Sequence, residues 1–127
     1  MATRIYLIRH GESARSYDGR CYGQTDLPLS EKGREQMASL AEKLLRMPPQ
    51  RIYCSDLVRS RESAQILGRT WSLSPITCPE LREINMGLWE GLSYEEIHLR
   101  HPRQAALWEA GSLSFRFPKG EGLRELK

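Results

Sequence analysis

The chain opens on a block of apolar residues that ends in polar ones. Residues 5–8 (Ile-Tyr-Leu-Ile) are four apolar side chains in a row, three of them β-branched or aromatic. A run of this length and type predicts a short buried strand. The run stops at Arg9, His10 and Gly11. Because glycine allows a sharp turn, Arg9 and His10 are predicted at the carboxyl end of this strand, where open α/β sheets bind ligands.

A loop and then a helix are predicted next. Residues 14–29 are polar and rich in turn formers, which indicates a loop that leaves directly from the end of the first strand. Ser30 is suited to cap a helix, with an acid, Glu31, in its first turn. The consecutive prolines at 48–49 end that helix. Its apolar face is expected to consist of Met37, Leu40, Ala41, Leu44 and Leu45.

A second strand is predicted at residues 51–54 and a weaker third one at residues 75–78. Between them, a helix is predicted to begin after Ser55-Asp56, with Arg59 in its first turn. Strands that alternate with helices are typical of a parallel sheet with right-handed crossovers. In such a sheet Arg9, His10 and Arg59 lie at the same edge.

The second half of the chain is less regular. Residues 81–91 have no clean period and predict an irregular segment that lies over the site. Ser93 and Glu96 fit a capping box at the start of a helix, and Pro102 can open another. Residues 111–122 are expected to form a loop.

Length and composition exclude several classes of protein. The 127 residues suit one domain, 1–127, with a single core. A net charge of +3 without a block of basic and aromatic residues gives no support for nucleic-acid binding. Three cysteines, an odd number without metal-ligand spacing, indicate reduced thiols. No signal peptide or membrane span is recognisable, so we expect a soluble cytoplasmic protein that binds neither nucleic acid nor membrane.

His10 is the first candidate for chemistry. A strand-end histidine beside a fixed cation is well placed to attack an anionic phosphorus centre, and the alternative is a solvent-exposed turn that happens to contain a histidine. His98 and His101 have a spacing that could hold a metal, but no third ligand accompanies them. We interpret both as surface histidines and expect no metal and no cofactor.

Four ordered motifs resemble the histidine phosphatase superfamily, the phosphoglycerate-mutase-like proteins. They lie at residues 7–13 (Leu-Ile-Arg-His-Gly-Glu-Ser), 23–33, 55–60 and 81–91 and span essentially the whole chain. The resemblance implies a three-layer α/β/α fold with a mostly parallel sheet. The short span after Gly91 is similar to the phosphatase branch, in particular to α-ribazole phosphatases and broad-specificity phosphatases.

The resemblance also implies roles for individual residues. His10 would be the nucleophile that accepts the phosphoryl group, and Glu83 would be the general acid and then the base that activates water. Arg9 and Arg59 would clamp the phosphoryl oxygens. Further phosphate-side contacts would come from Ser16, Gln24 and Thr25.

One departure from the family pattern is large. The family carries a second histidine after a later strand, beyond the end of this chain, so the fold is expected to lack its C-terminal part. Either the chain is a piece of a longer enzyme, which we favour, or it is a short chain with weakened or no catalysis.

Three functions stay open on the sequence. The leading one is a phosphomonoester hydrolase that forms a phosphohistidine and acts on a small phosphorylated metabolite. The others are a phosphoglycerate mutase and a phosphate-ligand-binding module. The identity of the substrate and the oligomeric state are left open, with a homodimer among the candidates.

Overall fold

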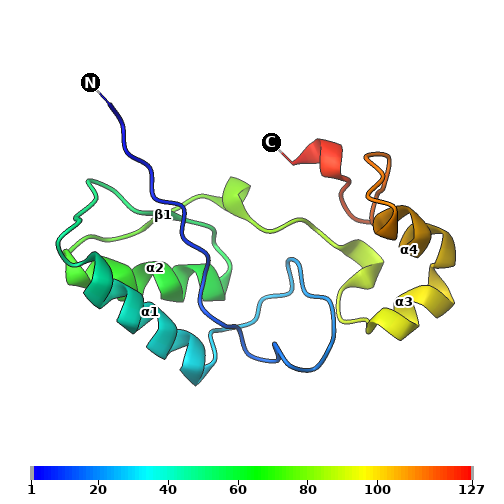
Figure 1. Cartoon of the computed structure of the whole chain (residues 1–127), viewed down its shortest axis with the longest axis horizontal. Helices are drawn as coiled ribbons and strands as arrows, with labels where there is room; N and C mark the ends of the chain where they lie inside the picture. The colour runs from blue at the N-terminus through cyan, green and yellow to red at the C-terminus, as the bar shows by residue number, and fades with distance from the viewer. Residues whose placement is uncertain (1, 127) are drawn as a thin grey trace. The chain divides into compact units, whose positions relative to one another are not determined.

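The computed structural model describes residues 2–126, which divide into two compact units. The N-terminal unit contains the chain up to Ala14 together with Leu27–Pro79, and the C-terminal unit contains Arg15–Asp26 together with the chain from Glu80 onward. The N-terminal unit holds two helices and two strands: α1 (Glu31–Leu44), β1 (Tyr53–Cys54), α2 (Val58–Thr70) and β2 (Ile76–Thr77). Figure 1 labels α1, β1 and α2. That both units belong to a single domain stays a prediction.

Helix α1 forms where the sequence predicts it. Ser30 is the N-cap, and its side chain accepts a hydrogen bond from the backbone N–H of Gly33. The helix ends at Leu44, ahead of the prolines at 48–49. It packs against α2 through a buried cluster that consists of Leu29, Met37, Ala41 and Leu67.

The two strands confirm the predicted parallel βαβ arrangement. Strand β1 pairs with β2 in parallel, with Tyr53 opposite Ile76 and Cys54 opposite Thr77, and α2 connects them. The N-cap of α2 is Leu57, which provides no side-chain cap; the hydroxyl of Ser55 instead accepts the Leu57 N–H. The prediction of an α/β fold with a parallel sheet is therefore confirmed, and the capping of α2 differs from the prediction.

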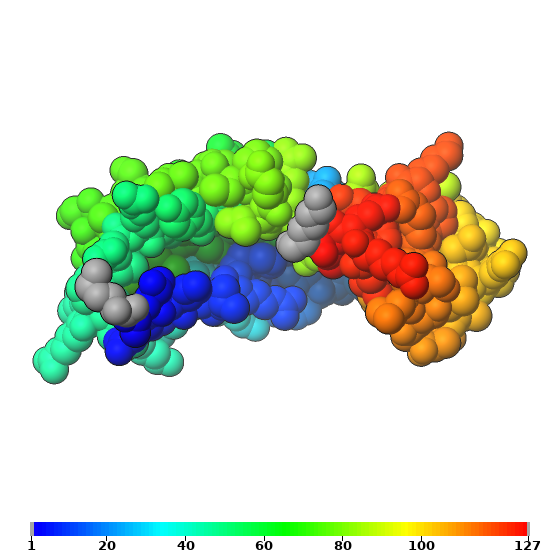
Figure 2. All heavy atoms as spheres, turned by 90° about the horizontal axis from the view of Figure 1, so that it is seen from above, coloured from blue at the N-terminus to red at the C-terminus, as the bar shows by residue number. Residues whose placement is uncertain are grey.

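The prediction of a buried first strand is wrong. Residues 2–10 form no strand in the structure, and the apolar side chains at 5–8 are exposed, with Leu7 94% and Ile5 75% accessible. Blue spheres of this segment lie uncovered at the surface in Figure 2. An apolar run reports a preference for burial, whereas a strand also needs a neighbouring backbone to pair with. No strand among residues 2–126 pairs with this segment.

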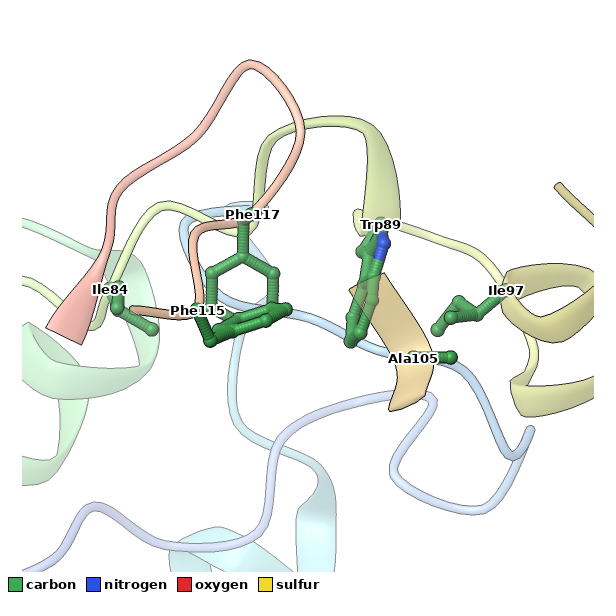
Figure 3. Close-up of a cluster of buried hydrophobic side chains, with 6 residues drawn as sticks. All are labelled: Ile84, Trp89, Ile97, Ala105, Phe115 and Phe117. Carbon is green, nitrogen blue, oxygen red and sulfur yellow. The ribbon is translucent and has the colours of Figure 1, made fainter. Parts of the chain in front are cut away.

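The C-terminal unit is built on two short helices and an aromatic cluster. Helix α3 (Tyr94–Arg100) begins with the predicted capping box of Ser93 and Glu96, and α4 (Pro102–Glu109) begins with proline. Among residues 2–126 there are also three single turns of 3-10 helix, at Pro79–Leu81 where the two units meet along the chain, and at Gly87–Trp89 and Leu123–Glu125. The core, shown in Figure 3, consists of Ile84, Trp89, Ile97, Ala105, Phe115 and Phe117.

Two of the aromatic pairs of this core pack edge to face. The ring centroids of Trp89 and Phe117 are 5.1 Å apart, and those of Phe115 and Phe117 are 4.7 Å apart with the planes at 83°. Such pairs add to the stability that the buried area already provides. Within the described part of the chain, no helix combines the length and the apolar character needed to cross a bilayer.

Candidate active site

His10 lies in an irregular segment, residues 9–12, that contacts both helices of the N-terminal unit. The following residue, Gly11, is buried, and a Cβ atom at this position would lie 2.4 Å from the carbonyl oxygen of Gly33 in α1. Glycine is required here because the two backbones approach so closely. On the other side, the Gly11 N–H donates to the hydroxyl of Ser63 in α2 at 3.1 Å. Gly11 is therefore held by contacts with both helices.

The ring of His10 has a defined hydrogen-bond partner. Its Nδ1 lies 2.7 Å from the carbonyl oxygen of Gly11. A carbonyl oxygen only accepts, so Nδ1 carries the hydrogen and the neutral ring keeps the lone pair on Nε2. This is the protonation pattern that nucleophilic attack by Nε2 requires.

Glu12 connects the same segment to α1 through hydrogen bonds. Its backbone N–H donates to the side-chain oxygen of Gln36 at 2.9 Å, and its carboxylate accepts from the Ser30 hydroxyl at 2.7 Å. Lys32 lies 3.5 Å from the other carboxylate oxygen. Ser30, the N-cap of α1, thus also positions Glu12, which follows His10 and Gly11 in the chain.

The two predicted phosphate-clamping arginines differ in their surroundings. Arg59 lies in the first turn of α2 and is only 5% exposed, whereas Arg9 is exposed at the end of the N-terminal segment. Both belong to the same unit as His10. The structure therefore brings the predicted nucleophile and the predicted cations into one unit.

The other predicted site residues belong to the C-terminal unit, where Glu90 organises a loop. Its carboxylate accepts from the backbone N–H groups of Gly23, Gln24 and Thr25 at 2.7–3.3 Å and from the Thr25 hydroxyl at 2.5 Å. Burial alone would raise the pKa of Glu90, but the hydrogen bonds, that of the Thr25 hydroxyl foremost, outweigh it and hold the pKa below 4.5. Glu90 is therefore an ionised anchor for the loop.

This loop touches the predicted general acid. The side-chain amide of Gln24 donates to the backbone carbonyl of Glu83 at 3.0 Å. The Glu83 side chain is exposed, and its carboxylate accepts from the backbone N–H of Ile84 at 2.9 Å. Gln24, Thr25 and Glu83 are thus brought together through Glu90 and the loop, while Ser16 is exposed in the turn at residues 14–17.

The remaining histidines lie in the C-terminal unit. His98 binds the Tyr94 carbonyl through Nδ1 at 2.9 Å and the Glu109 carboxylate through Nε2 at 2.8 Å. The Tyr94 carbonyl and then Glu109 raise the pKa of His98. His101 lies at the junction of α3 and α4. No group of three or more His, Cys, Asp or Glu side chains among residues 2–126 is arranged to hold a metal ion.

Comparison with known proteins decides the family. The model of the histidine phosphatase superfamily (branch 1) matches residues 5–127. The chain belongs to the histidine phosphatase superfamily. The first two of the four resembling motifs contain His10 with the segment around it and the loop whose backbone Glu90 binds.

Other histidine phosphatase superfamily members are similar over most of this chain. A probable phosphoglycerate mutase GpmB of Yersinia pestis is 32% identical over 97% of the chain. The α-ribazole phosphatase of Shigella flexneri matches 94% of the chain with a TM-score of 0.86 and 27% identity. A mycobacterial glucosyl-3-phosphoglycerate phosphatase, solved in complex with VO3, matches 89% with a TM-score of 0.80 and 34% identity.

The chain is shorter than these superfamily relatives. It spans 57% of the length of the GpmB protein, 59% of the α-ribazole phosphatase and 54% of the glucosyl-3-phosphoglycerate phosphatase. The similarity therefore establishes the family and the fold of the part that the chain covers.

Two residues that contact the predicted site segments, Ser63 and Glu90, receive no role from the sequence alone. Glu90 lies within the motif at 81–91, where only Glu83 is given a function. Ser63 lies four residues after Arg59, one turn further along α2. That spacing is the signal that could have found Ser63, because residues four apart lie on one helix face.

Proposed function

We propose that this protein is a phosphomonoester hydrolase that forms a phosphohistidine at His10. One observation carries the proposal: Nδ1 of His10 lies 2.7 Å from the Gly11 carbonyl oxygen, which leaves the Nε2 lone pair for attack, and Gly11 is bonded to the helix that holds the buried Arg59. The superfamily supports the proposal, because relatives of this chain are named as a phosphatase and as a probable phosphoglycerate mutase.

The proposed reaction has two steps. Nε2 of His10 forms a bond to phosphorus while the bond to the ester oxygen breaks, and the leaving alcohol takes a proton from the Glu83 carboxyl. The Glu83 carboxylate then takes a proton from water, whose oxygen attacks phosphorus and releases phosphate and free His10. General acid–base help of this kind accelerates a reaction by roughly 100- to 10,000-fold.

Cations and neutral donors would hold the phosphoryl group. Arg9 and Arg59 are proposed to bind its oxygens, since a guanidinium offers paired donors of suitable geometry. Ser16, Gln24 and Thr25 are proposed as additional phosphate or substrate contacts. Oriented positive charge of this kind stabilises a phosphoryl group during its transfer.

The proposed substrate is a small phosphorylated metabolite, similar to that of an α-ribazole phosphatase. The solved phosphatase structures with TM-scores of 0.80 and 0.86 support this class of reaction. The proposed location is the cytoplasm, where the three free cysteines would stay reduced. Phosphoglycerate mutase is a second candidate, because the GpmB relatives are 32% identical.

Hydrolysis of p-nitrophenyl phosphate by the wild type and by His10→Ala tests the proposal. We expect turnover and an acid-labile, alkali-stable label from 32P substrate in the wild type, and neither in His10→Ala. His98→Gln, which alters a histidine of the other unit, should keep both. Equal turnover by wild type and His10→Ala would remove His10 from the mechanism.

The two alternatives predict different products. With 3-phosphoglycerate, a mutase yields the isomerised phosphoglycerate and little free phosphate, whereas a hydrolase releases phosphate. A binding module would bind orthovanadate saturably and give no labelled protein.

A further inference from the structure

One buried hydroxyl connects the predicted nucleophile with the helix of the predicted phosphate clamp. The Ser63 hydroxyl accepts the Gly11 N–H at 3.1 Å and donates to the Arg59 carbonyl oxygen at 2.8 Å. Ser63 is 5% exposed, so water has little access to this chain of hydrogen bonds. A hydroxyl group is suited to this position because it donates and accepts at the same time.

The connection reaches the ring of His10 through Gly11. Ser63 holds the peptide plane that joins His10 to Gly11, and the Gly11 carbonyl, in the next plane, accepts the hydrogen of His10 Nδ1 at 2.7 Å. Gly11 is also confined by the Gly33 carbonyl, which a Cβ atom at position 11 would approach to 2.4 Å. If the Gly11 backbone moves, its carbonyl oxygen moves away from Nδ1 of His10, and the ring loses the hydrogen bond that selects its tautomer.

We propose that Ser63 is a positioning residue that fixes the tautomer and the direction of the His10 ring relative to Arg59. The expected effect of Ser63 on the rate rests on the proposed function. Its effect on the tautomer of the His10 ring does not, and can be tested without turnover. Ser63 touches neither the substrate nor the reacting atoms in this proposal. It acts through Gly11 on one side and through the first turn of α2 on the other.

Loss of the hydroxyl has a predictable effect on the rate. Without it, the buried Gly11 N–H has no acceptor, and residues 9–12 relax away from α2. A displacement of about 1 Å of a reacting group costs about 100-fold in rate. We expect kcat of Ser63→Ala to fall roughly 10- to 100-fold with KM changed less than about threefold, because the lost geometry acts on the chemical step.

Three variants separate the hydroxyl from simple packing. Ser63→Thr keeps a hydroxyl that can bond the carbonyl one turn earlier, so it should retain the wild-type kcat. Ser63→Cys keeps the volume but bonds weakly, so it should behave like Ser63→Ala even if the alanine variant fails to fold. Gln65→Ala, at an exposed position of the same helix, is the matched control and should change nothing.

Nitrogen-15 NMR of the histidine rings gives a readout that needs no turnover. The wild type should show the His10 ring with its hydrogen on Nδ1, assigned by the signal that His10→Ala removes. Ser63→Cys should shift this signal toward a mixture of tautomers, and Ser63→Thr should not. The idea is overturned if the His10 signal and kcat are unchanged in Ser63→Cys, or if Ser63→Thr is as impaired as Ser63→Cys. A wild type without phosphatase activity would refute the proposed function, and the ring signals would still decide the role of Ser63.

Discussion

Replacement of Glu90 by glutamine should loosen the loop at residues 23–25. The Glu90 carboxylate accepts from the Thr25 hydroxyl and from four backbone N–H groups, which belong to Gly23, Gln24, Thr25 and Met86. A glutamine side chain keeps one acceptor oxygen and turns an NH2 group toward the remaining donors. Glu90→Gln therefore removes part of the bonds and adds repulsion between donors.

The size of the effect follows from the hydrogen bonds that the substitution removes. A hydrogen bond to a charged group contributes about 1.5–3 kcal/mol, and at least two of the donors lose their acceptor. Because Glu90 is only half-buried, water compensates part of this loss. We expect the local opening free energy of the loop to fall by about 2 kcal/mol, which is about 30-fold in the opening equilibrium.

Amide hydrogen exchange measures this opening residue by residue. The Gly23, Gln24 and Thr25 amides should exchange about 30-fold faster in Glu90→Gln. Glu121→Gln is the matched control, since the Glu121 carboxylate accepts the Asn85 N–H in the same unit. Unchanged exchange at all three amides in Glu90→Gln, with the amide of residue 85 freed in the control, would refute the anchoring role of Glu90.

The pKa of Glu90 adds a dependence on pH. The folded pKa is lowered, so the stabilisation is present above the ordinary value of 4.5 and is lost as the pH falls through the lowered folded value. The difference in exchange between wild type and Glu90→Gln should therefore be constant near neutral pH. It should shrink in acid, where the carboxyl of the wild type becomes protonated, and a difference that grows in acid would contradict this account.

Three further predictions concern other parts of the chain. Gly33→Ala places a Cβ atom 2.0 Å from a backbone carbonyl oxygen, so urea unfolding should show a loss of about 1–3 kcal/mol, and an unchanged midpoint would contradict the close approach. Ile97→Ala empties a fully buried position and should cost about 2–5 kcal/mol in the same assay, whereas Leu99→Ala, 82% exposed, should stay within about 0.5 kcal/mol. The Tyr94 carbonyl and then Glu109 raise the pKa of His98 above 6.5. Protonated His98 therefore stabilises the fold most below pH 6.5, and this stabilisation is lost as the pH rises through the raised pKa. The difference in melting temperature between wild type and His98→Gln should therefore shrink from pH 6 to pH 9, and a constant difference would contradict it.

Local rules explain what the sequence predicts well. The N-cap at Ser30, the capping box of Ser93 and Glu96 and the helix opened by Pro102 are each set by residues within one turn of each other. The parallel pairing of β1 and β2 follows from alternation of elements along the chain. Such features need no knowledge of distant contacts.

Distant contacts explain what the sequence does not predict. Gly11 and Ser63 are 52 residues apart in the chain, and Gln24 and Glu90 are 66 apart. Neither pair has a spacing, charge pattern or period that joins its members. The roles of Ser63 and Glu90 become visible only in the folded chain, where donor and acceptor lie together. The resemblance to a family identifies motifs, but it does not say which residues of two motifs form hydrogen bonds with one another.

The failure of the predicted first strand shows what the position of His10 depends on. The apolar run places the histidine at the end of a strand, yet residues 5–8 form no strand and are exposed. The backbone after the histidine is nevertheless held in place, because Gly11 contacts both Ser63 and Gly33. These contacts come from the residues that follow His10 and from the two helices, so they do not depend on whether residues 5–8 pair with another strand. The hydrogen bond from Nδ1, which leaves the Nε2 lone pair of His10 for attack, thus depends on Gly11 and on its contacts with α1 and α2. A substitution in residues 5–8 changes the position of the His10 ring only through the direction in which the backbone reaches Arg9.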